Sequence, residues 1–309
     1  MRSKEEFMSY KVVVLIKPKD EQPALDRAAE FARFMPDLEV VAVRVVNEFT
    51  EDKKQALEQT YTRELINLKD RYPSIEHFTP KVLFAEDVAE GFCDFAGCAS
   101  HQFDLVIISA NKRNTLKDLF FSTIDSQIMR KVPVPLLVVK DAQAPQRLSR
   151  AIVLAIDFEE DNHDKFVDEV LFESAKIFAD NFNGEVHVLN CVPPRHTSLM
   201  GGNLSQSVIL GNKKPLSRTD VHAQALCAFA ERHGIPQENC HIAEGRVDEM
   251  IPKVCEGLEA RMVCMGTSNN DGILSAIDQG ASELVLEQVK GDLFIVNRLV
   301  KLENLRPKS

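Results

Sequence analysis

The chain has 309 residues, of which 44% are hydrophobic and 27% charged, and its formal net charge at pH 7 is −10. This composition is typical of a globular protein of about two domains, and the negative charge argues against nucleic acid or an anionic membrane surface as a partner. No apolar stretch approaches the roughly 18–20 residues of a membrane span, and residues 1–7 lack the apolar core of a secretion signal. We therefore expect a cytoplasmic protein without membrane insertion.

Short apolar runs alternate with segments of helical periodicity along the chain. The runs are too apolar to have a solvated face, which is typical of strands covered on both sides in a parallel sheet, and the alternation predicts right-handed βαβ units. The predicted strands are 12–16, Leu38–Val46, Phe78–Phe84, Leu105–Ser109, Leu136–Val139, Ala151–Asp157, Glu185–Val192, Asn239–Ala243, Met262–Thr267 and Leu293–Val296. The predicted helices are Glu21–Phe34, Glu51–Arg71, Val88–Ser100, Leu116–Arg130, Asp164–Phe182, Thr219–His233, Val247–Leu258 and Ile273–Val289.

The same order of apolar segments occurs twice, which predicts two copies of one α/β unit. The corresponding segments are Lys11–Lys17 and Ala151–Asp157, Asp104–Ser109 and Arg261–Gly266, and Pro133–Val139 and Lys290–Val296. We predict a first domain over residues 8–141, a linker over 142–149 and a second domain over 150–302.

The second copy is longer because of one segment, Pro193–Pro215, which follows the second predicted strand of that copy. A connection of this length in a compact domain is often a lid or a binding loop. A tolerated surface insertion is the alternative, and the sequence leaves both open. As a segment that follows a strand, it is expected at the carboxyl edge of the sheet, where a lid would cover a ligand.

The ordered set of segments across nearly the whole chain resembles the universal stress protein family, specifically its tandem-domain members. The residues that carry this resemblance are Asp20–Leu25, Leu119–Thr123, Met129–Lys140, Met265–Thr267, Gly272–Ser275 and Ala281–Glu283. The resemblance implies two tandem nucleotide-binding-like α/β domains, each a five-stranded parallel sheet of strand order 3-2-1-4-5 with helices on both faces. It also implies that the two fifth strands face each other across a pseudo-two-fold axis, so that the chain is an intramolecular pseudo-dimer.

Many members of this family bind ATP through a glycine-rich loop that follows strand four and opens a helix, with an Asp at the end of strand one. Glycines let backbone N–H groups approach the phosphates, and the helix N-terminus favours an anion. In the second copy Asp157 and Met265-Gly266-Thr267 match this pattern. Asn269 and Gln279 stand at two glycine positions, and Gly280 stands where Ser or Thr is expected.

These departures predict a weakened nucleotide site. Asn accepts a positive φ, so the turn at Asn269 is compatible with the family loop, but its side chain and that of Gln279 occupy space that phosphates need. A carboxylate such as that of Asp271, about 4 Å from a phosphate, costs roughly 1–4 kcal/mol. The ligand-binding residues implied for this cleft are Asp157, Met265, Gly266, Thr267, Asn269, Gly280, Ala281 and Ser282.

In the first copy the nucleotide pattern is absent, because Lys17, Ser109, Lys112 and Ser122 occupy the corresponding positions. The second copy leaves three possibilities: ATP, a different small ligand in the same cleft, or an empty structural site in which Asp157 caps the following turn. Mg²⁺ is expected only if ATP binds.

Other chemistry lacks its sequence patterns. No Gly-x-Ser-x-Gly elbow, Walker loop or His-Glu-x-x-His occurs. Histidine and cysteine recur in the second copy, but their spacing matches no metal-ligand pattern, so no metal site is expected. Several of the seven cysteines lie in apolar runs and are predicted to be buried, reduced thiols, with Cys227 and Cys240 at core positions.

The sequence therefore predicts a stress-response protein that acts by binding a ligand or partner rather than by turnover. One alternative is an ATP-binding switch with slow ATPase or autophosphorylation activity in the second domain. Another is an apolar or amphipathic ligand held between the two domains.

Overall fold

A computed structural model of the chain describes residues 10–18, 20–110, 123–140, 150–158, 165–192, 217–267, 281–297 and 299–300. The strands are β1 (Lys11–Leu15), β2 (Glu39–Val46), β3 (His77–Phe84), β4 (Leu105–Ser109), β5 (Leu136–Val139), β6 (Ala151–Ala155), β7 (Glu185–Val192), β8 (Cys240–Glu244), β9 (Met262–Thr267) and β10 (Asp292–Asn297). The α-helices are α1 (Pro23–Ala32), α2 (Lys54–Lys69), α3 (Val88–Gly97), α4 (Thr123–Lys131), α5 (Lys165–Phe182), α6 (Arg218–His233), α7 (Val247–Gly257) and α8 (Ala281–Gln288).

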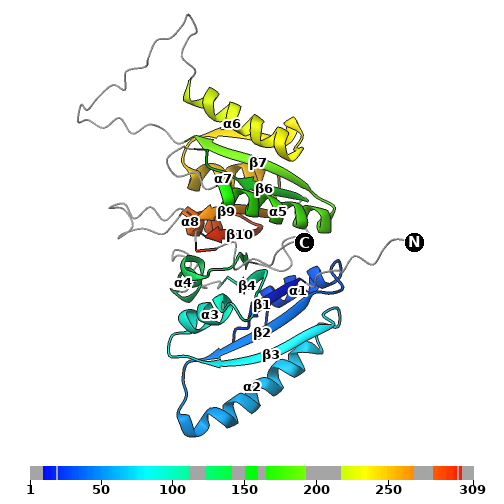
Figure 1. The fold of residues 1–309 in the computed structure, drawn as a ribbon, viewed down its shortest axis with the longest axis vertical. Helices are drawn as coiled ribbons and strands as arrows, with labels where there is room; N and C mark the ends of the chain where they lie inside the picture. The colour runs from blue at the N-terminus through cyan, green and yellow to red at the C-terminus, as the bar shows by residue number, and fades with distance from the viewer. Residues whose placement is uncertain are drawn as a thin grey trace, which may run out of the picture.

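The strands form one sheet in the order β3-β2-β1-β4-β5-β10-β9-β6-β7-β8. Within each repeat the five strands are parallel and follow the predicted order 3-2-1-4-5. Figure 1 shows the two repeats stacked along the long axis of the molecule, with α2 and α6 at opposite ends. Among the described residues, no helix is long and apolar enough to cross a bilayer.

Two apolar cores lie on the two faces of the sheet. Residues of α1, α2, α5 and α6 pack in the core on one face, and residues of α3, α4, α7 and α8 pack in the core on the other. Strands covered on both faces explain the uninterrupted apolar runs of the sequence. Each predicted helix is present, with ends that differ from the predicted ones by up to three residues where the structure describes them. Residues 116–122, 164 and 273–280, predicted as helical, lie outside the described residues, as do 141–149.

The two repeats join through their fifth strands. β5 and β10 pair in the antiparallel direction, with Leu137 opposite Phe294. These two residues occupy corresponding positions in the two repeats, so the pseudo-two-fold axis passes between them. The two sheets expected from the sequence are therefore hydrogen-bonded into one, which pairs two strand edges that would otherwise be left open.

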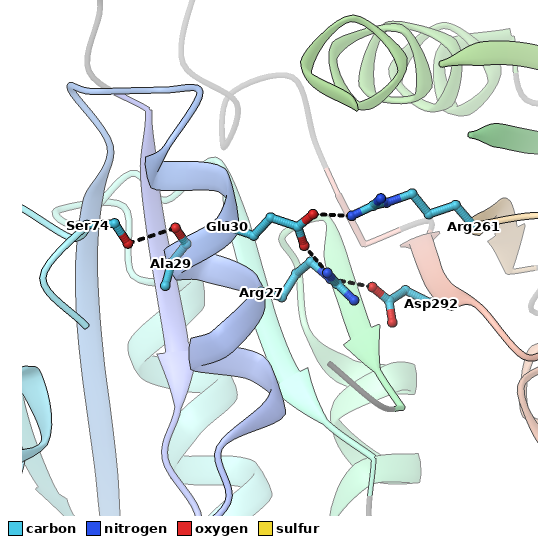
Figure 2. A network of polar contacts seen from close by, with 6 residues as sticks. All are labelled: Arg27, Ala29, Glu30, Ser74, Arg261 and Asp292. Carbon is cyan, nitrogen blue, oxygen red and sulfur yellow. Dashed lines mark hydrogen bonds and ion pairs between the residues drawn. The ribbon is translucent and has the colours of Figure 1, made fainter. Parts of the chain in front are cut away.

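A charged network links the repeats on the α1 and α5 face (Figure 2). Arg27 Nε on α1 donates to Asp292 Oδ2 on β10 at 2.7 Å, and each side chain is only 2% exposed. Arg27 also contacts Glu30, which is in turn contacted by Arg261. Burial raises the pKa of the Asp292 carboxyl, while the two arginines oppose that rise. Two cations of this network thus offset the cost of burying a carboxylate between the domains.

Aromatic rings complete the contact. Phe31 of α1 stacks on Phe178 of α5 with ring centroids 5.6 Å apart, and Phe178 lies edge-on to Phe294 at 5.3 Å. The Arg261 guanidinium lies 3.7 Å from the centroid of Phe182. Polar and aromatic contacts therefore come from both repeats, which fixes the two domains to each other.

Corresponding residues of the two repeats also cap each other's helices. Lys140 Nζ, which follows β5, donates to the carbonyl oxygens of Leu286, Glu287 and Val289 at 2.7, 3.2 and 2.6 Å. At the corresponding position after β10, Asn297 donates to the Val132 carbonyl at the end of α4. A cation at a helix C-terminus satisfies carbonyls that have no partner within the helix and also interacts favourably with the helix dipole.

We expect Lys140→Met to lower the free energy of unfolding by about 1.5–3 kcal/mol, the usual size of a hydrogen bond to a charged group. The variant should also increase amide hydrogen exchange at the end of α8, measured by mass spectrometry. Asn297→Ala is the matched control and should increase exchange in α4 instead. Equal exchange of α8 in the wild type and in Lys140→Met would contradict this role for Lys140.

Four cysteines (Cys93, Cys191, Cys255 and Cys264) are buried, and all seven are free. Burial raises the pKa of Cys93 to about 12 and that of Cys191 to about 11, so these thiols are protonated and inert at neutral pH. The core position predicted for Cys227 is wrong, because this residue is exposed on α6.

Candidate functional site

The candidate site lies where the chain leaves β6 and β9. These neighbouring parallel strands are in register from Ile152 opposite Met262 to Ala155 opposite Met265. The exposed Asp157 therefore follows β6 at the same edge at which Gly266 and Thr267 end β9. α5 follows β6 on one face of the sheet and α8 follows β9 on the other, which makes this the point of strand-order reversal where α/β folds bind ligands.

The start of α8 belongs to the same edge. A helix that connects two parallel strands runs back along the sheet, so its N-terminus lies at the carboxyl ends of the strands. α8 begins at Ala281, followed by Ser282. The structure thus brings five of the predicted residues to one edge: Asp157, Gly266, Thr267, Ala281 and Ser282. Asn269 and Gly280 lie outside the described residues, as does 193–216, which contains the predicted lid.

The glycine at 266 has a packing role of its own. A Cβ atom at Gly266 would lie 3.1 Å from Val167 Cγ1 and 3.9 Å from Leu171 Cδ1, both on α5. The first is tighter than ordinary van der Waals contact, so the glycine lets α5 approach β9 closely. Met265 is only 5% exposed and packs in the core on the opposite face. Met265 is therefore a core residue, whatever its backbone contributes at this edge.

In the first repeat, side chains of the protein fill the corresponding place. Lys17, the counterpart of Asp157, contacts the Ser109 carbonyl and lies 3.0 Å from Asp125 Oδ1 on α4. The Asp125 side chain is fully buried and that of Lys17 is 11% exposed. Ser109, the counterpart of Gly266, accepts a hydrogen bond at Oγ from the Ala24 N–H at the start of α1, at 2.9 Å.

These contacts form an internal plug, which we define as Lys17, Ser109 and Asp125. The residues at the corresponding positions of the second repeat are Asp157, Gly266 and Ser282. A carboxylate, a glycine and a hydroxyl cannot form an ammonium–carboxylate pair. The residues of the second repeat therefore cannot make the ion pair of the internal plug. The two repeats therefore differ in charge and in bulk at the same place in the fold.

A buried polar pair adjoins the second-repeat site. Asn190 on β7 is fully buried, and its amide donates to the Ile156 carbonyl at 2.8 Å, directly before Asp157. Its Oδ1 lies 2.9 Å from His222 Nδ1 on α6. Because the Asn190 amide nitrogen donates to a carbonyl, its oxygen must accept, which assigns the proton to His222 Nδ1.

Burial lowers the pKa of His222, and the neighbouring Arg218 lowers it further, while Asp157 opposes the shift. A histidine whose folded pKa is lowered stabilises the fold above its unfolded pKa of about 6.5, and this stabilisation is lost as the pH falls towards the folded pKa. We therefore expect the free energy of unfolding to decrease between about pH 7.5 and about pH 5.5, measured by urea denaturation.

The variant His222→Gln, which keeps a donor for Asn190, should show a shallower decrease of stability over this pH range. His77→Gln, at an exposed position on β3, is the control and should retain the wild-type slope. An unchanged slope in His222→Gln would rule out a contribution of this ring.

Sequence reasoning did not single out Asn190. The signal was present, since Asn190 is the one polar residue in the run Val188-Leu-Asn-Cys-Val192. A polar side chain in a strand buried on both faces requires a partner, but the sequence did not show that this partner is His222.

The model of the family described as Universal stress protein family matches residues 8–140 and 149–297. The chain belongs to the universal stress protein family. It is a tandem member, because the family model matches once in each repeat.

Similar proteins are known in several bacteria. A Universal stress protein E from Salmonella typhi is 23% identical over 308 residues, covering 94% of each chain. The Universal stress protein E homolog of Haemophilus influenzae is 28% identical over 198 residues. That match spans 63% of this universal stress protein and 62% of the Haemophilus protein's own length.

Solved structures show the same fold. A putative universal stress protein from Pseudomonas aeruginosa has a TM-score of 0.68 at 21% identity, covering 94% of this chain and 93% of that one. A universal stress protein from Archaeoglobus fulgidus has a TM-score of 0.66 at 13% identity, over 94% of this chain and all of the other. At these identities the likeness extends to the fold of this universal stress protein and not to its ligand.

Proposed function

We propose that this universal stress protein binds a small molecule at the carboxyl ends of β6 and β9 in its second domain, and that its first domain is the structural partner. In this view the protein acts by binding in a stress response and not by turnover. The observation that carries the proposal is the internal plug of the first repeat. Lys17 and Asp125 form a buried ion pair there, whereas the second repeat places Asp157 and Ser282 at these positions.

The chemistry of the second-domain site favours a ligand with hydrogen-bond donors or positive charge near Asp157. The start of α8 favours an acceptor or an anionic group at the other end. ATP satisfies both requirements, but Asn269 and Gln279 stand where the family pattern has glycines, and Asp271 adds a negative charge to the same segment of the sequence. We therefore propose that ATP binds weakly, and Mg²⁺ only together with it.

The test is isothermal titration of the purified full chain with ATP and Mg²⁺. We expect a dissociation constant weaker than about 10 μM for the wild type. The triple variant Asn269→Gly/Gln279→Gly/Gly280→Ser should bind more tightly, because it removes the two side chains and restores a hydroxyl at the start of the helix. Lys112→Gly, at the position of the first repeat that corresponds to Asn269, should leave the affinity unchanged.

Two outcomes would contradict the proposal. Tight ATP binding by the wild type, abolished by Asp157→Asn and accompanied by hydrolysis or autophosphorylation, would establish the ATP-dependent switch instead. An unchanged affinity in the triple variant would show that Asn269 and Gln279 do not weaken the site. Mass spectrometry of the purified protein identifies any other small molecule bound at this edge.

A further inference from the structure

Two histidines of the second domain lie next to each other near the amino ends of β7 and β8. His187 lies near the start of β7 and His241 near the start of β8, whereas the candidate ligand site lies at the carboxyl ends of the strands. His187 Nδ1 and His241 Nε2 share a hydrogen bond at 3.1 Å, and the tautomers of the two rings decide which nitrogen donates. The two rings are inclined by only 22°, with centroids 5.3 Å apart. Both side chains are half-buried.

We propose that His187 and His241 form a binding site for a divalent transition metal ion such as Zn²⁺. Zinc binds histidine nitrogens at about 2.0–2.1 Å in tetrahedral geometry, so two such nitrogens lie about 3.3 Å apart. The observed separation of 3.1 Å is close to this value. The facing nitrogens are therefore already placed at the spacing that two ligands of one ion require.

The protonation state of the pair suits a metal. Burial lowers the pKa of both rings, so both are neutral at neutral pH, as ligands must be. When the ion binds, His187 carries its proton on Nε2 and His241 on Nδ1, which frees the two facing lone pairs without net proton release. Glu185, two residues before His187, opposes the lowering of the His187 pKa, and its negative charge favours a cation at this place.

The described residues supply two ligands to the proposed site. Within the part of the chain that the structure describes, no group of three or more His, Cys, Asp or Glu side chains gathers around one point. In the proposed site, water completes the coordination sphere, which leaves the ion exchangeable. β8 is a strand at the end of the sheet and pairs with β7 alone. An ion held by one histidine from each strand ties β8 to the rest of the second domain.

Isothermal titration of the full chain with ZnCl₂ at neutral pH tests the site. We expect saturable binding to the wild type and a loss of affinity of tenfold or more in His187→Gln and in His241→Gln. Loss of an outer-shell partner already costs roughly 10- to 100-fold in metal affinity, and loss of a ligand should cost at least as much. His77→Gln, on the strand at the opposite end of the sheet, should bind as the wild type does.

A second measurement separates binding from folding. Zn²⁺ should raise the thermal unfolding midpoint of the wild type and leave those of both histidine variants unchanged, while all proteins show the same circular dichroism spectrum without metal. No saturable binding to the wild type would overturn the proposal. So would binding that persists in either His187→Gln or His241→Gln, since the ion would then lie elsewhere.

Discussion

Replacing Arg27 with methionine is expected to lower the free energy of unfolding by about 3–5 kcal/mol, because it leaves the Asp292 carboxylate buried without its hydrogen-bonded partner. The two side chains are each 2% exposed and lie on different domains (Figure 2). Methionine is unbranched and flexible, so it fills much of the space of the arginine, and the expected loss reflects charge rather than a cavity. Urea denaturation of the full chain measures the effect.

The pH dependence of this loss has a defined sign. Without Arg27, burial raises the pKa of Asp292 in the folded state above its unfolded value. A raised folded pKa means that the folded state keeps a proton that the unfolded chain releases, so stability falls as the pH rises through this range. The difference between Arg27→Met and the wild type should therefore be smaller at acid pH than at neutral pH.

Two controls distinguish the cost of leaving a buried charge without a partner from the cost of breaking an exposed salt bridge. The double variant Arg27→Met/Asp292→Leu removes both charges and should recover most of the lost stability, since apolar replacements of buried ion pairs are often neutral or stabilising. Arg232→Ala breaks a pair with Glu169 in which both side chains are about half exposed, and it should cost less than about 1 kcal/mol. If the double variant is as unstable as Arg27→Met, the loss comes from packing instead.

The second large effect is expected for Phe178→Ala, at about 3–5 kcal/mol. Phe178 is 2% exposed and its ring contacts Phe31 of the first domain and Phe294 at the domain junction. Removal of the ring leaves a cavity beside Phe31 and Phe294. Phe34→Ala removes a ring that is 52% exposed and touches Phe182 at its edge, so it should cost less than about 1 kcal/mol.

Urea denaturation of Phe178→Ala measures this loss and also reports whether the two domains unfold together. Because Phe178 packs across the domain junction, we expect its loss to broaden urea unfolding or split it into two transitions. A single transition with an unchanged midpoint in Phe178→Ala would show that these rings do not contribute to the coupling of the two domains.

The repeat explains why two halves of similar sequence pattern form one sheet. Corresponding residues meet at the axis, as Leu137 and Phe294 do, and corresponding residues after the fifth strands cap helices of the opposite domain. The charged network, by contrast, is asymmetric, because Asp104 and Pro135 are the residues of the first repeat that correspond to Arg261 and Asp292.

The sequence by itself determined the local order of the fold. The runs before Lys17 and Asp157 predicted strands because their residues are apolar on both faces, and the spacing in Glu21–Phe34 and Asp164–Phe182 predicted helices. The strand order of each repeat was implied by the family that the duplicated sequence resembles. Predicted boundaries differ by a few residues where capping decides, as at Pro23, which begins α1 two residues later than expected because proline favours the first helical turn.

Only the tertiary structure decided which side chains meet. Lys17 pairs with Asp125, and the Asn190 side chain hydrogen-bonds to His222. Gly266 makes room for Val167. Each of these contacts joins residues that lie 32 to 108 positions apart in the chain. The spacing of His187 and His241 matched no metal-ligand pattern, yet parallel pairing of β7 and β8 brings them to 3.1 Å. Periodicity reports which face a residue takes, because it depends on local backbone geometry. Partners across the fold depend on packing, which no linear pattern contains.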